Sequence, residues 1–441
     1  MSTQTLSPTA GNADLRAQVD AMRPRPRVDK QIWGIYILLV IISLIELYSA
    51  SSREVEAGNI LGPLIRHAGL LFGGFIIMVA LQRVHYVRFY KFAYIIVGLC
   101  IVAAIYTFFF GDVINGARRS FRLLGIGVQS SELLKFAAAL LIARVLSNYV
   151  INYTKGKEEA EERHNRWLVG ICASVVLCFG ALLISQGLTN TLLLMAISLS
   201  VMLIGAVRWK EFGVVLAVYL ALGGGYYVVK HIVDDNRQES FDSAMLKGET
   251  ADRTDIQKGR ISSWLRADKH LDPITNDNRQ EQYSYIAQAN GGILGVFPGN
   301  SRETARLPLA FSDYIYAIII EDTGLVGGII VMCLYLWLLA RAGTIAFKCR
   351  KRFPALLVVG MAVFIVCQAL MHMGIVTGFL PVSGQPLPLI SKGGSSVIVT
   401  SVALGIMLSV SRFAARKGQR QQLQESISTL SDDDMPDNVT T

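Results

Sequence analysis

The chain has 441 residues, of which 52% are hydrophobic and 17% are charged, and its formal net charge is +9. This composition excludes an ordinary soluble protein, because the apolar residues fall in runs of about 20, the length that spans a bilayer core. The positive charge gathers in short segments between these runs, so it indicates membrane topology and not nucleic-acid binding.

The apolar runs predict an all-α integral membrane protein with about ten transmembrane helices, since a helix satisfies its backbone hydrogen bonds within the bilayer. They divide the chain into a polar tail (residues 1–31), a membrane domain (32–414) and a second polar tail (415–441). The predicted spans, in chain order, are residues 32–51, 62–81, 91–110, 130–149, 167–185, 189–207, 212–230, 314–340, 355–376 and 388–411.

Lys and Arg gather in both tails and in alternate short loops between the spans. Because positively charged loops stay on the cytoplasmic side, both termini are predicted to be cytoplasmic. The hydrophilic segment between spans seven and eight, residues 231–313, then forms one large extracytoplasmic loop. The residues that set this orientation include Arg23, Arg25, Arg27, Arg83, Arg88, Lys155, Lys157, Arg208, Lys210, Lys348, Arg350, Arg412 and Arg416.

Asp313 stands where the large loop runs into the eighth apolar segment. A carboxylate at this boundary is predicted to lie at the outer mouth of a membrane cavity. Ionisable groups near membrane depth are usually functional, because burying their charge is expensive. Asp313 is therefore the leading candidate for a catalytic group.

The outer loop between spans three and four breaks the charge rule, because it contains Arg118, Arg119 and Arg122. One interpretation is a contact with phospholipid head groups. The other is a site for a diphosphate, since guanidinium groups match phosphate oxygens in bidentate geometry. Glu132 and Lys135 follow at the start of the fourth span, three residues apart and so on one face of the predicted helix.

Four blocks of the sequence resemble the SEDS family, which includes FtsW, RodA and SpoVE, and they occur in the family's order. The family elements are NGARRW with QPSE..K, a large outer loop, LPE..TDFIFA with EE.G..G, and LPVTGLPLPFISYGGSS. The matching segments here are Asn115–Arg119 with Gln129–Lys135, residues 260–301, residues 307–327, and Leu380–Ser396, which reads LPVSGQPLPLISKGGSS.

The resemblance implies a peptidoglycan glycosyltransferase that polymerises lipid II in the bacterial cytoplasmic membrane, together with a class B penicillin-binding transpeptidase. It matches the family's essential acid to Asp313. Its outer-loop arginines match Arg118 and Arg119, and its span-four acid and base match Glu132 and Lys135. The expected substrate-binding residues are Arg118, Arg119, Arg122, Glu132, Lys135, Arg260, Lys392, Ser395 and Ser396.

The implied reaction joins the 4-hydroxyl of one disaccharide to the anomeric carbon of another, with inversion and release of undecaprenyl diphosphate. One carboxylate, here Asp313, can accept the hydroxyl proton as a general base. Cations in a partly dry cavity can stabilise the leaving diphosphate. A divalent cation, Mg²⁺ or Mn²⁺, could bridge Asp313 and the diphosphate, but no ligand spacing in the sequence demonstrates a metal site.

The chain departs from the family pattern at several positions. Ser120 replaces a Trp, Leu309 replaces a Glu, Lys392 replaces a Tyr, and His372 replaces an Asn in span nine. Where the family reads EPDLGT, this chain has SQGLTN over residues 185–190, so Gly187 stands in place of an acid. These departures leave Asp313 more isolated as the catalytic acid, and their effect on activity stays open.

Several groups keep two interpretations. Glu132 and Lys135 either neutralise one another inside the bundle or contact substrate. Arg260 either pins the large loop to the bundle or binds substrate, and Lys392 either snorkels to the interface or faces the site. His372 is expected to be a hydrogen-bonded interior residue. Prolines and glycines in Leu380–Ser396 predict a broken helix that lines a cavity.

Three functions remain on the sequence alone: a lipid II polymerase, a lipid II flippase, and a scaffold for the septal machinery. Outer cations and broken helices would serve either of the first two. The two tails favour an FtsW-like division protein at the septum, with other division proteins as partners, over a RodA-like elongation protein. No nucleic-acid partner is expected.

Overall fold

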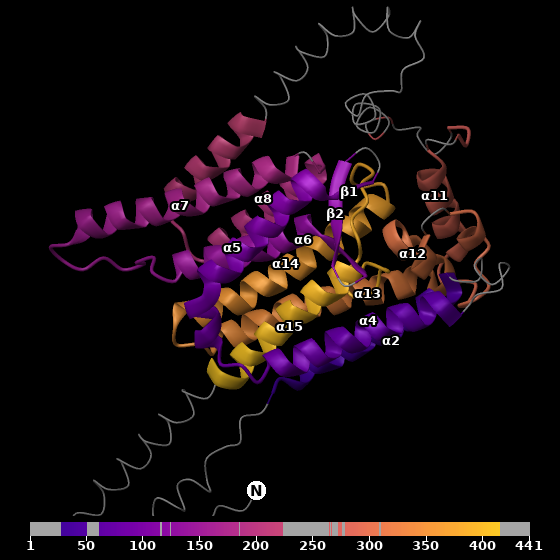
Figure 1. Cartoon of the computed structure of the whole chain (residues 1–441), viewed down its shortest axis with the longest axis horizontal. Helices are drawn as coiled ribbons and strands as arrows, with labels where there is room; N and C mark the ends of the chain where they lie inside the picture. The colour runs from indigo at the N-terminus through magenta and orange to yellow at the C-terminus, as the bar shows by residue number, and fades with distance from the viewer. Residues whose placement is uncertain are drawn as a thin grey trace, which may run out of the picture.

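The computed structural model describes residues 28–50, 61–114, 117–123, 125–184, 186–223, 264, 266, 272–275, 278–307 and 310–414. Helices dominate these ranges and run side by side as a bundle (Figure 1). They are α2 (Lys30–Ala50), α4 (Leu61–Leu81), α5 (Tyr86–Phe110), α6 (Ser130–Leu146), α7 (Glu158–Ile184), α8 (Leu188–Ile204), a helix over residues 209–223, α11 (Arg279–Gly291), α12 (Ala310–Asp313), α13 (Ile315–Phe347), α14 (Arg352–Val376) and α15 (Gly394–Ala414).

Among the described residues, seven helices are long and apolar enough to cross a membrane, namely α2, α4, α5, α7, α13, α14 and α15. The shorter helices α6 and α8, each of 17 residues, and the helix over 209–223 match the other predicted spans. The prediction of an all-α multi-pass membrane protein is thus confirmed. The cytoplasmic placement of the termini stays a prediction.

Several span boundaries differ from the prediction, among them the start of α7 at Glu158 (expected 167) and the end of α13 at Phe347 (expected 340). The tenth span was expected to begin at residue 388, but α15 begins at Gly394, because residues 380–393 form an irregular segment. We call residues 380–393 the proline segment. The seventh-to-eighth loop was expected to end at Asp313, and α12 already forms a helical turn over Ala310–Asp313.

The core of the bundle consists of α6, α14 and α15. α14 packs against α6, α13 and α15, and α15 also packs along α4. Nearly every side chain of α6 is buried, including four alanines that let neighbouring helices approach closely, Ala137, Ala138, Ala139 and Ala143. The charges that interrupt the fourth predicted span therefore lie inside the protein and not against lipid.

A small antiparallel sheet covers one end of α5 and α6, where the sequence suggested only a loop. Its strands are β1 (Asp112–Ile114), β2 (Ala117–Leu123) and β3 (Ile126–Gln129), in the order β1-β2-β3. Ser120 pairs with Gln129 and Arg122 with Gly127. The β1–β2 register shifts at Arg119, because Asp112 pairs with Ser120 and Val113 with Arg118, so Arg119 is the extra residue of a β-bulge.

We call the end of the bundle that carries this sheet, α11 and α12 the outer end, after the predicted orientation (Figure 1). There α13 is broken at Gly324, whose φ is 73°. The freed carbonyls of Glu321 and Asp322 accept hydrogen bonds from the backbone N–H groups of Val296 and Phe297, at 2.9 and 2.8 Å. A Cβ on Gly324 would lie 2.1 Å from the carbonyl oxygen of Ile293, so this close backbone docking requires glycine.

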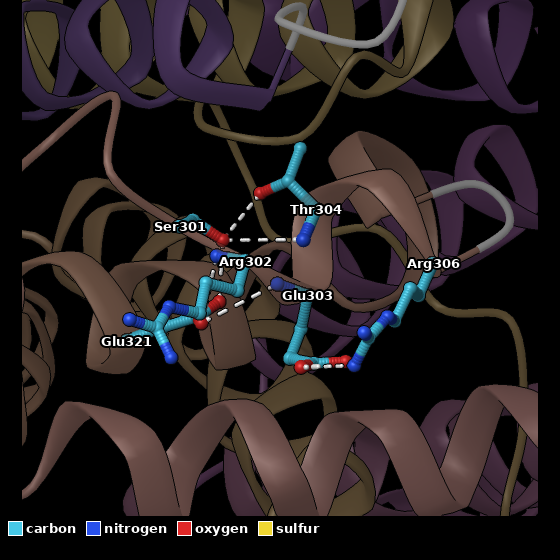
Figure 2. Close-up of polar contacts among 6 residues, drawn as sticks. All are labelled: Ser301, Arg302, Glu303, Thr304, Arg306 and Glu321. Atoms are coloured by element: carbon cyan, nitrogen blue, oxygen red, sulfur yellow. Dashed lines mark hydrogen bonds and ion pairs between the residues drawn. The ribbon is translucent and has the colours of Figure 1, made fainter.

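The Glu321 carboxylate fastens the next part of the outer loop. It accepts hydrogen bonds from the Ser301 hydroxyl and from the backbone N–H groups of Arg302 and Glu303, at 3.1 and 3.4 Å for the last two (Figure 2). Burial raises the pKa of Glu303, and Arg306 stabilises its charged form with an ion pair of 3.2 Å. We call Glu321 with residues 301–303 the outer-loop clasp. It holds the segment that leads to Asp313.

Candidate active site

Asp313 ends the short helix α12, and the non-helical backbone of Tyr314 (φ −129°, ψ 21°) separates it from α13. The chain therefore turns at the carboxylate, which is partly exposed. The Ser312 hydroxyl donates a hydrogen bond to Asp313 Oδ1 at 3.0 Å. A Cβ on Gly384 would lie only 2.8 Å from Asp313 Oδ2, so the proline segment passes directly over the carboxylate.

Hydrogen bonds join the proline segment to α12. Ser391 Oγ donates to the carbonyl of Ser312 at 2.8 Å, and the backbone N–H of Lys392 donates to the carbonyl of Phe311 at 3.0 Å. The Lys392 ammonium lies 4.3 Å from the centre of the Phe311 ring. These contacts place Lys392 on the same short stretch of structure as Asp313.

A cavity of about 90 Å³ opens beside this contact. Its walls are Arg119 from β2, the turn Gln186–Asn190 with Leu192 before and within α8, and Pro381–Gln385 from the proline segment. Gly384 belongs to the wall of the cavity and also touches the Asp313 carboxylate. Gly384 thus lies between the Asp313 carboxylate and the cavity that Arg119 lines, and these residues come from segments far apart in the sequence.

Lys135 lies directly behind the cavity wall and is fully buried. Its Nζ donates to Gln385 Oε1 at 3.2 Å and to Asn190 Oδ1 at 3.4 Å. Gln385 Nε2 donates to Asn190 Oδ1 at 3.0 Å, and His372 Nδ1 donates to the Gln385 carbonyl at 2.6 Å. His372 is therefore the hydrogen-bonded interior residue that was expected.

Glu132 is also buried, one turn before Lys135, but it has different partners. Gln368 Nε2 donates to its Oε1 at 3.2 Å, and Ser395 and Ser396 lie beside its carboxylate. In the described part of the chain, no direct ion pair joins Glu132 to Lys135, although each lies in the field of the other. Mutual neutralisation inside the bundle, without a contact ion pair, therefore stays one of the two interpretations of these residues.

The predicted arginines do not act as a group in this structure. Arg118 turns to the backbone carbonyls of Phe108 and Phe109 at the end of α5, and Arg122 forms an exposed ion pair of 3.5 Å with Asp112. Only Arg119 of the three lines the cavity. Arg260 lies outside the described residues, and so does Leu309. Trp264, which is described, donates to the Phe379 carbonyl at 3.3 Å.

Sequence reasoning missed Asn190, Gly384 and Gln385 as site residues. Gln385 stood inside the quoted block Leu380–Ser396, and Asn190 closes the block in which the family acids are absent. Both departures were therefore visible, but nothing in the sequence showed that they meet at Lys135. That meeting depends on the packing of α6, α8 and the proline segment.

The profile of the family described as "Cell cycle protein", FtsW/RodA/SpoVE, matches residues 29–416. The chain belongs to this family. This FtsW/RodA/SpoVE protein is similar to a probable peptidoglycan glycosyltransferase FtsW of Dichelobacter nodosus. The two sequences are 29% identical over 397 residues, and the alignment covers 86% of this chain and 90% of the relative. This chain is 27% identical over 381 residues to the peptidoglycan glycosyltransferase MrdB of Escherichia coli K12, covering 85% and 92%.

Solved structures of other proteins have the same fold as this FtsW/RodA/SpoVE chain. A chain from a peptidoglycan synthase complex, described as coordinating polymerization and crosslinking, superposes with a TM-score of 0.61 at 23% identity, covering 88% of this chain and 98% of that one. The rod shape determining protein RodA of Thermus thermophilus gives a TM-score of 0.57 at 22% identity, covering 88% and 97%.

Proposed function

We propose that this FtsW/RodA/SpoVE protein is a peptidoglycan glycosyltransferase that polymerises lipid II into β-1,4-linked glycan strands. The observation that carries the proposal is the Asp313 carboxylate, placed against Gly384 at the wall of a cavity that Arg119 also lines. The relatives named as peptidoglycan glycosyltransferases, matched over most of both chains, support it.

In the proposed reaction, Asp313 accepts the proton of the attacking 4-hydroxyl as the new bond forms at the anomeric carbon. The bond from that carbon to the diphosphate oxygen breaks, and undecaprenyl diphosphate leaves with the electron pair. Attack from the opposite side inverts the anomeric carbon. Arg119 lines the cavity together with Gly384, and Lys392 lies against Phe311 of α12, so we assign both cations to the diphosphate. Lys135 adds positive charge from behind the wall.

A divalent cation, Mg²⁺ or Mn²⁺, fits this site only with the substrate present. The described residues contain no group of three or more His, Cys, Asp or Glu side chains that could hold a metal ion. Mg²⁺ in phosphate-handling sites is commonly bound by one or two carboxylates and by substrate phosphates. Asp313 would supply the carboxylate, and the bound ion would neutralise charge on the diphosphate.

We also propose that the protein acts with a class B penicillin-binding transpeptidase and other division proteins at the septum. The resemblance to a chain from a peptidoglycan synthase complex supports a transpeptidase partner. The FtsW relatives support a division role, whereas the similarity to MrdB keeps an elongation role as the alternative outcome. A fluorescent fusion at midcell supports the first, and one along the side wall supports the second.

The test uses the purified full chain, its cognate transpeptidase and fluorescent lipid II. Glycan ladders are expected from the wild type and are expected to disappear in Asp313→Ala. The matched control is Asp272→Ala, which removes an outer-loop carboxylate that is paired with Arg266 at 2.5 Å. Lipid II scrambling without polymer, unchanged in Asp313→Ala, would instead identify a flippase. Full complementation of a deletion strain by Asp313→Asn would indicate a scaffold.

A further inference from the structure

The side chains of Lys135, Asn190 and Gln385 form a closed triangle of hydrogen bonds behind the cavity wall. Two of the three bonds run from the Lys135 ammonium to amide oxygens, and the third runs from Gln385 to Asn190. Asn190 stands where the quoted family motif EPDLGT has Thr, and Gln385 stands where LPVTGLPLPFIS has Leu. These two departures of the chain therefore meet as one structural unit.

The chemistry of the ammonium group determines how both amides are turned. An ammonium has only donors, so Asn190 and Gln385 must each present oxygen to Lys135. Asn190 Oδ1 accepts two hydrogen bonds in this way, at 3.4 Å from Lys135 and at 3.0 Å from Gln385. The NH₂ group of Asn190 is consequently directed away from the triangle.

That NH₂ group is available to a ligand. Asn190 is 4% exposed and lines the cavity, and no residue that the structure describes accepts a hydrogen bond from its Nδ2. The Nδ2 group is open to the cavity, where water or an acceptor of a ligand can meet it. A cavity of about 90 Å³ has room for about three water molecules, or for a group of similar volume.

The electrostatic surroundings favour an anionic acceptor. Lys135 is bonded to neutral amides, so none of its hydrogen bonds brings a negative charge to the cavity wall. Inside a protein, hydrogen bonds in a chain polarise one another, and the ammonium therefore strengthens Asn190 Nδ2 as a donor. Arg119 lies on another wall of the same cavity. Glu132 is hydrogen-bonded to Gln368, but it also lies in the field of Lys135 and offsets part of its charge, so Arg119 is the second positive charge at this cavity.

We propose that Asn190 is a substrate-binding residue whose Nδ2 donates to a phosphate oxygen of the prenyl diphosphate. Lys135 polarises the amide, and Gln385 is a positioning residue that holds its oxygen toward the ammonium. The proposal rests on the proposed function, because that function brings a prenyl diphosphate to the Asp313 cavity. It assigns a role to a position at which this chain departs from the family motif.

The decisive variant is Asn190→Asp, measured in the purified full chain in lipid nanodiscs. Aspartate has the same shape and can still accept from Lys135 and Gln385, but it replaces the donor with a second carboxylate oxygen. The Kd of undecaprenyl diphosphate is expected to rise about tenfold or more. Gln385→Glu, which keeps the acceptor for Lys135 but adds a negative charge, is expected to raise the same Kd.

The matched control is Asn148→Asp, which adds the same charge at an exposed position near the inner end of α6 and should leave the Kd unchanged. Thermal unfolding shows whether each variant is folded. If Asn190→Asp does not fold, Asn190→Ser removes the amide without adding charge and should still raise the Kd. Unchanged binding in the folded Asn190 variants, or an equal loss in Asn148→Asp, would overturn the proposal.

The binding readout separates this inference from the proposed function. A wild type that binds undecaprenyl diphosphate through Asn190 but makes no glycan in the presence of its transpeptidase would refute the polymerase and keep the binding site. A polymerase in which Asn190→Asp and Asn190→Ser leave both Kd and KM unchanged would keep the function and refute the role of Asn190.

Discussion

Two buried polar centres at the outer end of the bundle differ in how completely their hydrogen-bonding groups are paired. In the outer-loop clasp, the Glu321 carboxylate receives three hydrogen bonds from the Ser301 hydroxyl and two backbone N–H groups. In the triangle behind the cavity, Lys135 also has its partners, but the Asn190 NH₂ group has none among the described residues. The clasp uses its polar groups to hold structure, whereas the triangle keeps a donor for a ligand.

The difference teaches how to separate structural from binding roles among buried polar residues. A buried polar group that meets all its partners stabilises the fold, and removing it costs stability because those partners are left unsatisfied. A polar group that remains unsatisfied beside a cavity gains its partner only with a ligand. Variants of the clasp should therefore change unfolding, and variants of the triangle should change binding.

Among the variants that test this difference, Lys135→Met is expected to have the largest effect, on ligand binding. The unbranched apolar side chain fills a similar volume, but Gln385 Oε1 loses its donor, so the free energy of unfolding should fall by about 1–2 kcal/mol. The Kd of undecaprenyl diphosphate should rise about thirtyfold or more, because the buried positive charge behind the cavity is lost. Equilibrium binding in nanodiscs measures this, with the exposed Lys210→Met as control. Wild-type binding by Lys135→Met would remove the contrast between the two centres.

Glu321→Ala should mainly lower stability and have little direct effect on the binding of undecaprenyl diphosphate. Loss of the carboxylate leaves three donors in a buried site, and the free energy of unfolding should fall by about 2–4 kcal/mol. The outer loop near residues 292–307 should also become more sensitive to protease. Glu321→Gln, which keeps one acceptor oxygen, should be affected less. Full thermal stability in Glu321→Ala would show that the clasp does not hold the loop.

Gly384→Ala tests the contact between the proline segment and the catalytic candidate. The added Cβ would lie 2.8 Å from Asp313 Oδ2, so the carboxylate must shift. The kcat for glycan synthesis should fall about tenfold, because a small displacement of a catalytic group is costly, while KM changes less. Gly343→Ala is the matched control, since a Cβ there meets nothing within 4 Å. An equal loss in both variants would contradict the prediction.

The smallest effect is expected from Arg122→Ala. Its ion pair with Asp112 is exposed, with side-chain exposures of 82% and 52%, and such pairs contribute little. Neither thermal stability nor KM should change measurably, whereas Arg119→Ala, which removes a side chain from the cavity wall, should raise KM. A KM that rises equally in both variants would show that lining the cavity does not divide the two arginines by function.

The fold could be predicted largely from the sequence, because hydropathy is a local property. Each of the ten predicted apolar spans overlaps a helix of the described chain, including α6, although charged residues interrupt its apolar run. The sheet over residues 112–129 was missed, since short strands with arginines and glycines carry little apolar alternation. The start of the last span was misplaced because Leu387, Leu389 and Ile390 are apolar without being helical.

The candidate site was predicted in part. Lys392 is bonded to α12, which carries Asp313, and Arg119 lines the cavity beside Gly384, which lies next to the Asp313 carboxylate. Glu132 and Lys135 are buried inside the bundle. Arg118 and Arg122 were grouped with Arg119 because they are neighbours in sequence, but the three arginines have different contacts in the structure. The roles of all these residues stay predictions until the variants are measured.

The sequence by itself determined the membrane class, the positions of the apolar helices and the acid at the loop boundary. Each of these depends on composition or order within a short stretch of chain. Only the tertiary structure decided that Asn190 and Gln385 are the partners of Lys135, because these contacts join residues 55, 195 and 250 positions apart. Contacts over such separations arise from the packing of several helices, and no local pattern encodes them.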